Sequence, residues 1–176
     1  MKNVVVVMQP RSGSSLVTGI FAAHGWWTGE TTRDREYQRY ENAMIKAQFA
    51  GRDLVRGEFV TSREPLEWEP IEPWVLKVGT EDFPRIPADV AVKVYRNPSS
   101  ILASVMSRNP FTCRKYVAAL IERRHEMMDS IAGYTVDTNK LVAGDFAEIK
   151  AAIQACGAEF SEALVRSVID PSRWRH

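Results

Sequence analysis

The feature that most constrains the fold is a valine-rich run that ends abruptly in a short polar loop. Asn3 to Met8 contains four consecutive valines, and such a run is typical of a strand buried on both faces in the middle of a parallel sheet. Pro10 to Gly13 interrupts it. Apolar residues then recur at helical spacing from Ser14 to His24, and the next residue, Gly25, is a typical helix stop. The chain therefore begins with a strand–loop–helix unit.

Further strands and helices alternate along the rest of the chain. The patterns predict strands at about 74–78, 90–95 and 140–143, a loop at 62–73, and helices at about 33–50, 99–108, 110–132, 146–156 and 161–169. This alternation predicts an α/β fold, a three-layer α/β/α sandwich with a mostly parallel central sheet. We expect residues 1–176 to form a single domain, because no repeat or long linker divides them.

Composition limits the classes of partner. The net charge is +1, which gives no global attraction to nucleic acid or to an anionic membrane. No apolar stretch is long enough for a membrane span or a secretory signal. The two cysteines, Cys113 and Cys156, are far apart and form no metal-ligand pattern. We expect each to be a small buried apolar residue, and the protein to be cytoplasmic with no nucleic-acid or membrane partner.

The loop after the first strand has the composition of an anion site. Pro10, Arg11, Ser12, Gly13, Ser14 and Ser15 lead directly into the predicted helix. The first N–H groups of a helix lack internal partners and carry the positive end of its dipole, so they bind anions. The alternative is a serine–glycine turn with an incidental arginine. The nucleotide-binding pattern GxxxxGK[ST] fits poorly, because Ser14 stands where its lysine would be.

A second motif follows the strand at 90–95. Arg96 is followed by Asn97-Pro98, and Ser104 stands eight residues after the arginine. A guanidinium offers a planar fork of donors that suits phosphate, and Ser104 would lie nearly two helical turns further on. The alternative places Arg96 in a surface salt bridge and Ser104 in packing. Both motifs follow strands, and ligands of parallel sheets bind at the carboxyl ends of strands.

The stretches MQPRSGSSLVTGIFAAHG and VKVYRNPSSILASVMSR together resemble the sulfotransferases that use 3′-phosphoadenosine 5′-phosphosulfate (PAPS). The resemblance is to the small bacterial and phage-type branch with arginine in the loop. It implies a P-loop NTPase-like sulfotransferase fold and PAPS as cosubstrate, with PAP as product. It also implies that residues 10–15 bind the 5′-phosphosulfate, and that Arg96 and Ser104 hold the 3′-phosphate. LVAGDF, residues 141–146, resembles a later strand of that family.

The resemblance also suggests catalytic roles. Arg11 would stabilise the leaving phosphate and Lys77 would contact the sulfonate, while Glu30 is the candidate general base, with Glu81 and Asp82 as rivals. The acceptor is a small molecule, glycan or peptide, and the sequence does not indicate an oligomeric state. A P-loop kinase and a non-catalytic PAPS- or PAP-binding module are the alternative functions.

A few other residues have two interpretations each. Trp26 and Trp27 line an acceptor pocket or simply pack. His24 is expected to pack or cap its helix, and Arg108 to be a solvated helix-end residue rather than a phosphate contact. The tail with Arg173 and Arg175 either contacts the nucleotide or is a frayed terminus.

Overall fold

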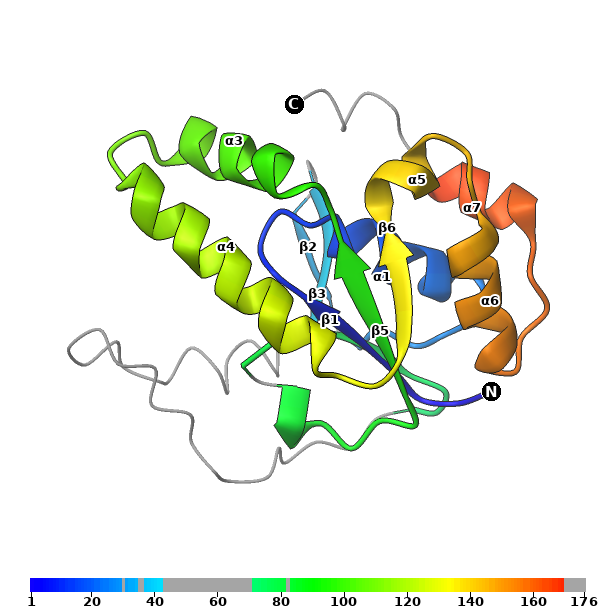
Figure 1. The fold of residues 1–176 in the computed structure, drawn as a ribbon. Coiled ribbons are helices and arrows are strands. Elements are labelled where there is room, and N and C mark those ends of the chain that lie inside the picture. Colours follow the sequence, from blue (N-terminus) through cyan, green and yellow to red (C-terminus); the bar gives the residue numbers. More distant parts are fainter. Residues whose placement is uncertain (30, 35–36, 43–70, 82, 170–176) are drawn as a thin grey trace.

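The computed structural model describes residues 1–29, 31–34, 37–42, 71–81 and 83–169. A four-stranded sheet lies at the centre (Figure 1), in the order β4-β1-β5-β6, and every neighbouring pair is parallel. Its strands are β1 (Val4–Met8), β4 (Val75–Gly79), β5 (Val90–Tyr95) and β6 (Tyr134–Asp137). The predicted α/β class with a parallel sheet is therefore confirmed.

Strand β1 is central because its side chains are apolar on both faces. Val4 to Val7 are all fully buried, and Val4 lies opposite Val75 of β4 and Val90 of β5. Val4 and Val6 belong to one core cluster and Val5 and Val7 to another. Because successive side chains of a strand point to opposite faces, this one run supplies the centre of both cores.

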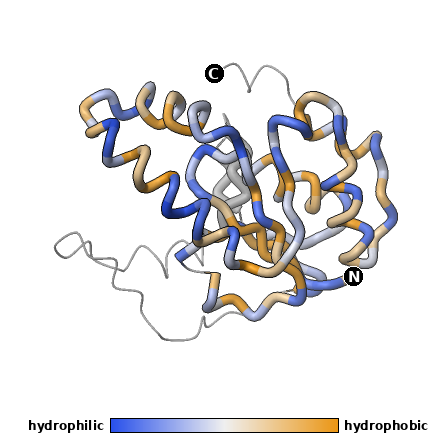
Figure 2. Tube along the Cα trace, viewed as in Figure 1, coloured by the Kyte–Doolittle hydropathy of each residue, from blue (hydrophilic) through white to orange (hydrophobic). Residues whose placement is uncertain are grey.

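Helices cover both faces of the sheet (Figure 1). The cluster with Val4 and Val6 takes in residues of α1 (Ser14–Ala23), α6 (Ala147–Ala155) and α7 (Glu162–Val168). The opposite cluster includes Met128 of α4 (Arg114–Asp129). Figure 2 shows hydrophobic residues concentrated along the strands between these helices. The layers are compatible with an α/β/α sandwich, in which amphipathic helices bury their apolar sides against the sheet.

The remaining elements lie at the edges of this sandwich. Helix α3 (Pro98–Arg108) forms a hairpin with α4, whose interior holds Ile101, Val117 and Ile121. Helix α5 (Thr138–Val142) follows β6 directly, and η1 (Phe83–Arg85) is one short 3-10 turn. Strands β2 (Thr31–Asp34) and β3 (Tyr37–Asn42) pair with each other as a separate antiparallel ribbon.

Most predicted elements are confirmed to within a few residues, but two are wrong. In its described part, the helix predicted at 33–50 is the β2–β3 ribbon; threonine and tyrosine, which fit strands well, outweigh the three-and-four spacing there. The strand predicted at Lys140–Ala143 is also wrong. Strand β6 ends at Asp137, whose side chain accepts from the Asn139 N–H and caps α5, so the apolar pair after it is helical.

The turn between α3 and α4 also differs from expectation. The helix predicted from Pro110 begins at Arg114. Cys113 is exposed at its start, so the expectation that both cysteines are buried is wrong for Cys113 and confirmed for Cys156. The predicted loop at 62–73 lies largely outside the described residues.

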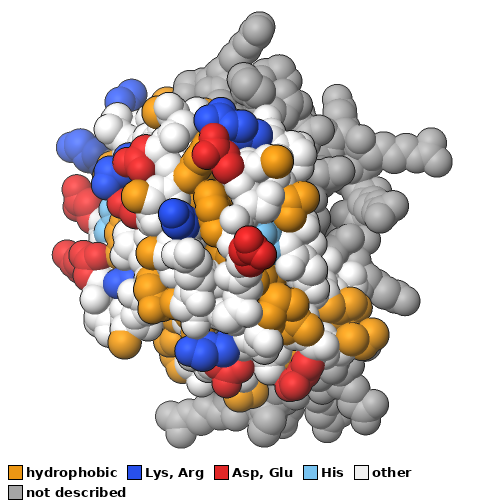
Figure 3. All heavy atoms as spheres, turned by 90° about the vertical axis from the view of Figure 1, so that its right-hand side faces the viewer, with side chains coloured by type: hydrophobic (Ala, Val, Ile, Leu, Met, Phe, Trp, Pro, Cys, Tyr) orange, Lys and Arg blue, Asp and Glu red, His pale blue; other side chains and the backbone are white. Residues whose placement is uncertain are grey.

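The surface over α5, α6 and α7 carries charges of both signs. Figure 3 shows basic and acidic side chains interspersed on this face, with hydrophobic atoms between them. No single-sign patch that would attract a polyanion is visible there. Within the described ranges, none of the helices is long and apolar enough to cross a membrane.

Candidate functional site

The two sequence motifs meet at the point where the strand order reverses. Strand β1 has β4 on one side and β5 on the other, so the connections that leave β1 and β4 run in opposite directions across the sheet. In open parallel sheets, the carboxyl ends of the strands beside such a reversal are the usual ligand-binding position. The loop at 9–13 follows β1, and Arg96 follows β5, at this edge (Figure 1).

The loop after β1 turns through two left-handed residues. Arg11 has φ 70° and Gly13 has φ 91°, and the Ser12 N–H donates to the Gln9 carbonyl at 3.3 Å. A left-handed conformation is easy for glycine and uncommon for arginine. Such strained residues are concentrated at functional sites. The turn places the amino terminus of α1 at the carboxyl edge of the sheet.

The amino end of α1 has no side-chain cap from the described residues, a feature that it shares with α4 and α6 but not with α3, α5 and α7. Asn97, Asp137 and Ser161 cap α3, α5 and α7 with side-chain oxygens. At α1, no side chain in the described part of the chain caps the helix, and its first turn has no acidic residue. The positive end of the α1 dipole is thus left without a negative partner from those residues.

Buried polar atoms in the same loop fit an anionic ligand. Ser12 is fully buried, and its Oγ has no hydrogen-bond partner among the described residues. Gln9 is also buried, and its side-chain Nε2 likewise has no hydrogen-bond partner among the described residues. Buried polar groups are nearly always paired, so an unpaired hydroxyl beside a helix amino terminus suits a bound oxyanion. We regard residues 10–15 as a candidate phosphate-binding loop on these grounds.

Hydrogen bonds join the first motif to the second. Arg11 Nε donates to Ser104 Oγ at 2.9 Å, across 93 positions of sequence. Arg96 Nη1 donates to the carbonyl oxygen of Arg11 at 3.2 Å. Ser104 itself is 1% exposed. Burial lowers the pKa of Arg96 from its ordinary value, but an arginine remains charged at neutral pH. Two guanidinium groups therefore share one small region with the loop.

Lys77 approaches the same loop from the opposite side. It lies on β4, and its Nζ donates to Ser15 Oγ at 3.1 Å, at the first turn of α1. The strand register places Lys77 opposite Val6 of β1. The structure thus brings together Arg11, Lys77, Arg96 and Ser104 around the 10–15 loop.

Thr138 is a site residue that the sequence analysis missed. Its hydroxyl lies 2.7 Å from the carbonyl oxygen of Ser12 and 3.0 Å from that of Tyr95. The residue is fully buried at the start of α5. It therefore ties the loop after β1 to the end of β5. No sequence pattern could indicate this contact, since Thr138 lies 126 positions from Ser12 and was placed outside any predicted element.

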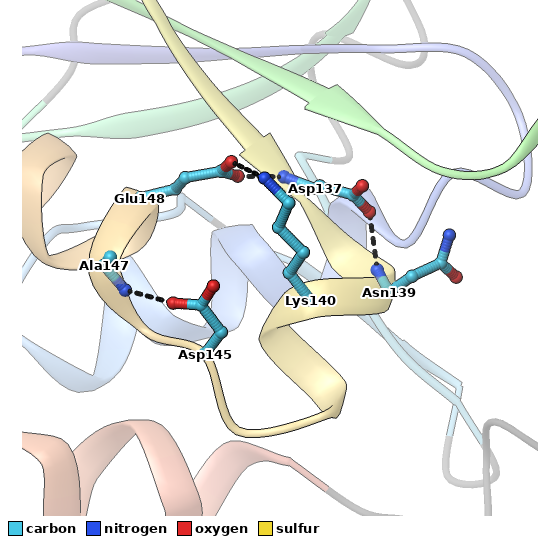
Figure 4. Close-up of polar contacts among 6 residues, drawn as sticks. All are labelled: Asp137, Asn139, Lys140, Asp145, Ala147 and Glu148. Carbon is cyan, nitrogen blue, oxygen red and sulfur yellow. Dashed lines mark hydrogen bonds and ion pairs between the residues drawn. The ribbon is translucent and has the colours of Figure 1, made fainter.

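Polar contacts join the start of α5 to α6 (Figure 4). Glu148 of α6 accepts from the Asp137 backbone N–H at 2.6 Å and from Lys140 Nζ at 2.7 Å. Figure 4 shows both contacts converging on the Glu148 carboxylate, with the Asp137 cap at the amino end of α5. These contacts stabilise the junction of β6, α5 and α6, and Thr138 is the first residue of α5, directly after Asp137.

Tyr95 connects the end of β5 to α4. Its phenol donates to Asp129 Oδ1 at 2.5 Å, and its ring stacks on His125 with centroids 5.3 Å apart. Burial and the hydrogen bond to Asp129 raise the pKa of Tyr95 above its ordinary value, so the phenol stays protonated. Burial also lowers the pKa of His125, against the opposing charge of Asp129. These contacts position the residue that immediately precedes Arg96.

Of the three candidates for the general base, only Glu81 lies among the described residues. Glu30 and Asp82 lie outside the described residues. Glu81 accepts from Arg124 Nε at 2.9 Å and from the Thr80 hydroxyl at 3.0 Å. Burial acts to raise the pKa of Glu81, but its hydrogen bonds and the charge of Arg124 outweigh this and lower it. A carboxylate held ionised by an arginine is a weak proton acceptor, so Glu81 is a poor candidate for the base.

Other residues singled out in the sequence have structural roles. Trp26 is 3% exposed, packs edge-on against Phe21, and donates from Nε1 to the Lys2 carbonyl. His24 lies between the Ile20 carbonyl and the Ser161 N–H, so it packs and caps as expected. LVAGDF does not form the expected strand, because α5 covers its first two residues. Arg173 and Arg175 lie outside the described residues.

Comparisons with known proteins assign no family to this chain. No protein-family model matches it, and a search of curated proteins returned no significant match. Within the described ranges, histidine, cysteine and acidic side chains form no group that could hold a metal ion. The geometry defines a candidate anion-binding loop at a switch point of the sheet, with basic side chains contributed by β4 and by the segments that follow β1 and β5.

Proposed function

We propose that this chain is a sulfotransferase that transfers the sulfuryl group of PAPS to an acceptor hydroxyl or amine. The observation that carries the proposal is the contact between the two motifs. Arg11 of the first motif donates to Ser104 of the second, and Arg96 donates to the Arg11 backbone. A nucleotide with phosphates at both its 5′ and 3′ ends suits two linked cationic sites better than a nucleotide with one phosphate chain.

The residues around the loop suit PAPS in a defined arrangement. The N–H groups at the start of α1 and the Ser12 hydroxyl would hold the 5′-phosphate, and Arg96 with Ser104 would hold the 3′-phosphate. When bound, PAPS supplies an activated sulfuryl group on a phosphate leaving group. The proposed P-loop NTPase-like fold agrees with the strand, loop and helix at residues 4–23.

The chain's own side chains would then supply positioning and charge. In an in-line displacement the acceptor oxygen or nitrogen bonds to sulfur as the sulfur–oxygen bond to the phosphate breaks. Arg11 and Lys77 would stabilise the negative charge that develops on the leaving oxygen. Lys77 is held by Ser15, next to where that charge would develop. The acceptor proton passes to a base, and Glu30 remains our proposal for it because Glu81 is paired with Arg124.

Phosphate binding would compete with the contact that Arg11 makes to Ser104. Arg11 Nε donates to Ser104, one of the groups proposed to hold the 3′-phosphate. Arriving phosphates would compete for both side chains, and a charge-assisted bond from arginine to phosphate is stronger than one to a neutral hydroxyl. A cytoplasmic, reducing setting is part of the proposal, and both cysteines are free thiols.

Calorimetric titration with PAP, ADP and ATP–Mg²⁺ tests the proposal. We expect the wild-type chain to bind PAP more tightly than ADP, since only PAP has a 3′-phosphate. Arg96→Ala should weaken PAP binding about 10- to 100-fold, because it removes a charged hydrogen-bond donor worth roughly 1.5–3 kcal/mol, and should leave ADP binding nearly unchanged. Arg123→Gln, which removes an exposed positive charge on α4, is the control.

Three results would decide against parts of the proposal. Equal binding of PAP and ADP would remove the 3′-phosphate site. Preferential binding of ATP–Mg²⁺ would favour a kinase. PAP binding with no sulfuryl transfer from PAPS to a panel of phenols, sugars and amines would leave a binding module in place of an enzyme.

A further inference from the structure

The turn between α3 and α4 exposes an aromatic side chain completely. Phe111 is 102% exposed, the highest value among the large hydrophobic side chains of the described residues, and nearby Tyr116 is 63% exposed. We call residues 108–116 the hairpin tip. It is the outer end of the α3–α4 hairpin, which projects from the body of the molecule (Figure 1). An isolated exposed hydrophobic residue is ordinary on a protein surface, so the surroundings of Phe111 decide its meaning.

Phe111 does not contribute to the interior of the hairpin. That interior is filled by Ile101, Val117 and Ile121, with Leu102, Val105 and Met106 packed against them. The helix predicted from Pro110 would have placed Phe111 on a helix surface, but α4 begins at Arg114 and leaves Phe111 in the turn. The aromatic ring therefore lies at the apex of the projection, and it does not pack against the hydrophobic residues inside the hairpin.

Basic residues surround this apex, and acidic residues are absent from its sequence. Arg114 and Lys115 are exposed in the first turn of α4. From Val90 to Ile121 the sequence has no aspartate or glutamate, and the first acid is Glu122. Glu122 lies about 10 Å along the helix from Lys115, at a rise of about 1.5 Å per residue. Figure 2 shows hydrophobic and hydrophilic residues adjoining at this outer turn.

We propose that the hairpin tip docks onto an anionic membrane surface. Phe111 would enter the headgroup region, while Arg114 and Lys115 would contact acidic headgroups behind it. Such a surface has negatively charged headgroups outside and an apolar region beneath them. An aromatic ring at the apex, with basic side chains set behind it, matches both layers. The tip is convex and suits a broad, yielding surface rather than an extended peptide, which would need a groove.

This inference differs from the expectation of no membrane partner. That expectation rested on the net charge of +1 and on the absence of a long apolar segment. Neither property excludes peripheral docking, which depends on local charge within about 10 Å of the bilayer. The proposal stands apart from sulfuryl transfer, because none of its residues belongs to the site at 10–15.

Vesicle co-sedimentation of the full chain tests the proposal. The probe is vesicles of phosphatidylcholine with about one third phosphatidylserine, compared with vesicles of phosphatidylcholine alone. We expect binding to the anionic vesicles only. Arg114→Gln with Lys115→Gln should lower the partition coefficient about 25-fold, at roughly fivefold per charge. Phe111→Ser should lower it about tenfold through lost apolar burial.

Matched variants on other surfaces serve as controls. Leu164→Ser removes an exposed hydrophobic side chain from α7, and Arg123→Gln removes a positive charge further along α4. Both should bind like the wild type. The exposed thiol of Cys113 gives a second readout within the tip: anionic vesicles should slow its reaction with a charged maleimide several-fold.

The proposal is overturned if the chain does not bind anionic vesicles, or if the tip variants bind as well as the controls do. Loss of binding in the double charge variant but not in Phe111→Ser, with equal binding to heparin, would indicate a general polyanion site and would also overturn it. Unchanged Cys113 labelling on vesicles that bind the chain would place the contact on another surface.

Discussion

At the scale of single residues, the candidate site depends on side chains that were predicted and on one that was not. Arg11, Arg96 and Ser104 follow from motif spacing, and the structure brings them into hydrogen-bonding contact. Thr138 was not predicted, because its role depends on where α5 begins in space. Its hydroxyl connects two carbonyls from different loops, so it positions the loops without itself being proposed to contact the ligand.

Thr138→Val tests this positioning role. Valine keeps the shape of the threonine side chain but removes the hydroxyl that donates to the carbonyls of Ser12 and Tyr95. Leaving a buried acceptor without its donor costs roughly 1–3 kcal/mol. We expect the free energy of unfolding in urea to fall by this amount and PAP affinity to fall several-fold. Thr138→Ser, which restores the hydroxyl, should recover the affinity. A loss of stability with unchanged PAP affinity would show that Thr138 stabilises the fold only.

At the scale of elements, the junctions between strands and helices decide the geometry. Gly133 precedes β6 with φ 154°, and a Cβ there would collide with the carbonyl oxygen of Ala91 on β5. Gly144 follows α5 with φ 94°, and a Cβ there would meet no atom within 4 Å. Gly133 is thus required because a side chain would collide with strand β5, whereas Gly144 is required only because its backbone has a positive φ.

Alanine at each position separates the two effects. Gly133→Ala should destabilise the fold by about 3 kcal/mol or more, since the pairing of β5 and β6 has to shift. Gly144→Ala should cost only the left-handed strain, about 1–2 kcal/mol. Urea unfolding midpoints at constant slope measure both. Equal losses would mean that β6 accommodates the methyl group without moving from β5.

The ion pair of Glu81 and Arg124 links the end of β4 to α4. Because the pKa of the Glu81 carboxyl is lowered in the folded chain, folding favours its ionised form. This stabilisation is present above the ordinary carboxyl pKa of about 4.3 and is lost as pH falls through the lowered folded-state value.

Glu81→Gln should therefore cost stability at neutral pH and little at acid pH. We expect a loss on the order of 1 kcal/mol at pH 7, because the pair is partly exposed. The difference between variant and wild type should shrink as pH falls below about 4.3, the ordinary glutamate value. Denaturant unfolding at a series of pH values measures it, with Glu162→Gln in the exposed α7 ion pair as control. A difference that is independent of pH would contradict the lowered pKa.

At the scale of the whole molecule, the reactivities of the two thiols distinguish the folded protein from a protein whose core has opened. Cys113 is exposed at the hairpin tip, whereas Cys156 is fully buried in the core shared by β1, α1 and α6. Burial raises the pKa of the Cys156 thiol to about 11, so few of these thiols are ionised at pH 8 and the sulfur is shielded from reagents. Reaction at Cys156 requires the core to open.

Thiol labelling at pH 8 should therefore be biphasic. We expect Cys113 to react at the rate of a free thiol and Cys156 to react orders of magnitude more slowly. PAP at about 100 times its dissociation constant should slow the Cys156 phase up to about 100-fold, because only the folded chain binds the ligand, and should not change the Cys113 phase. Labelling of single-cysteine variants assigns each phase. A Cys156 phase that PAP does not slow would mean that the core opens without the site unfolding.

The sequence by itself determined the parallel sheet, the central place of β1 and the positions of both basic motifs. These follow from local properties: continuous burial of the valines, helix stop signals, and residues at fixed spacing after a strand. Only the tertiary structure decided that Arg11 meets Ser104, that Thr138 joins the two loops, that β2 pairs with β3 and that Phe111 is exposed. Those outcomes depend on contacts between residues far apart in the chain and on where helices begin, and local sequence patterns do not specify either.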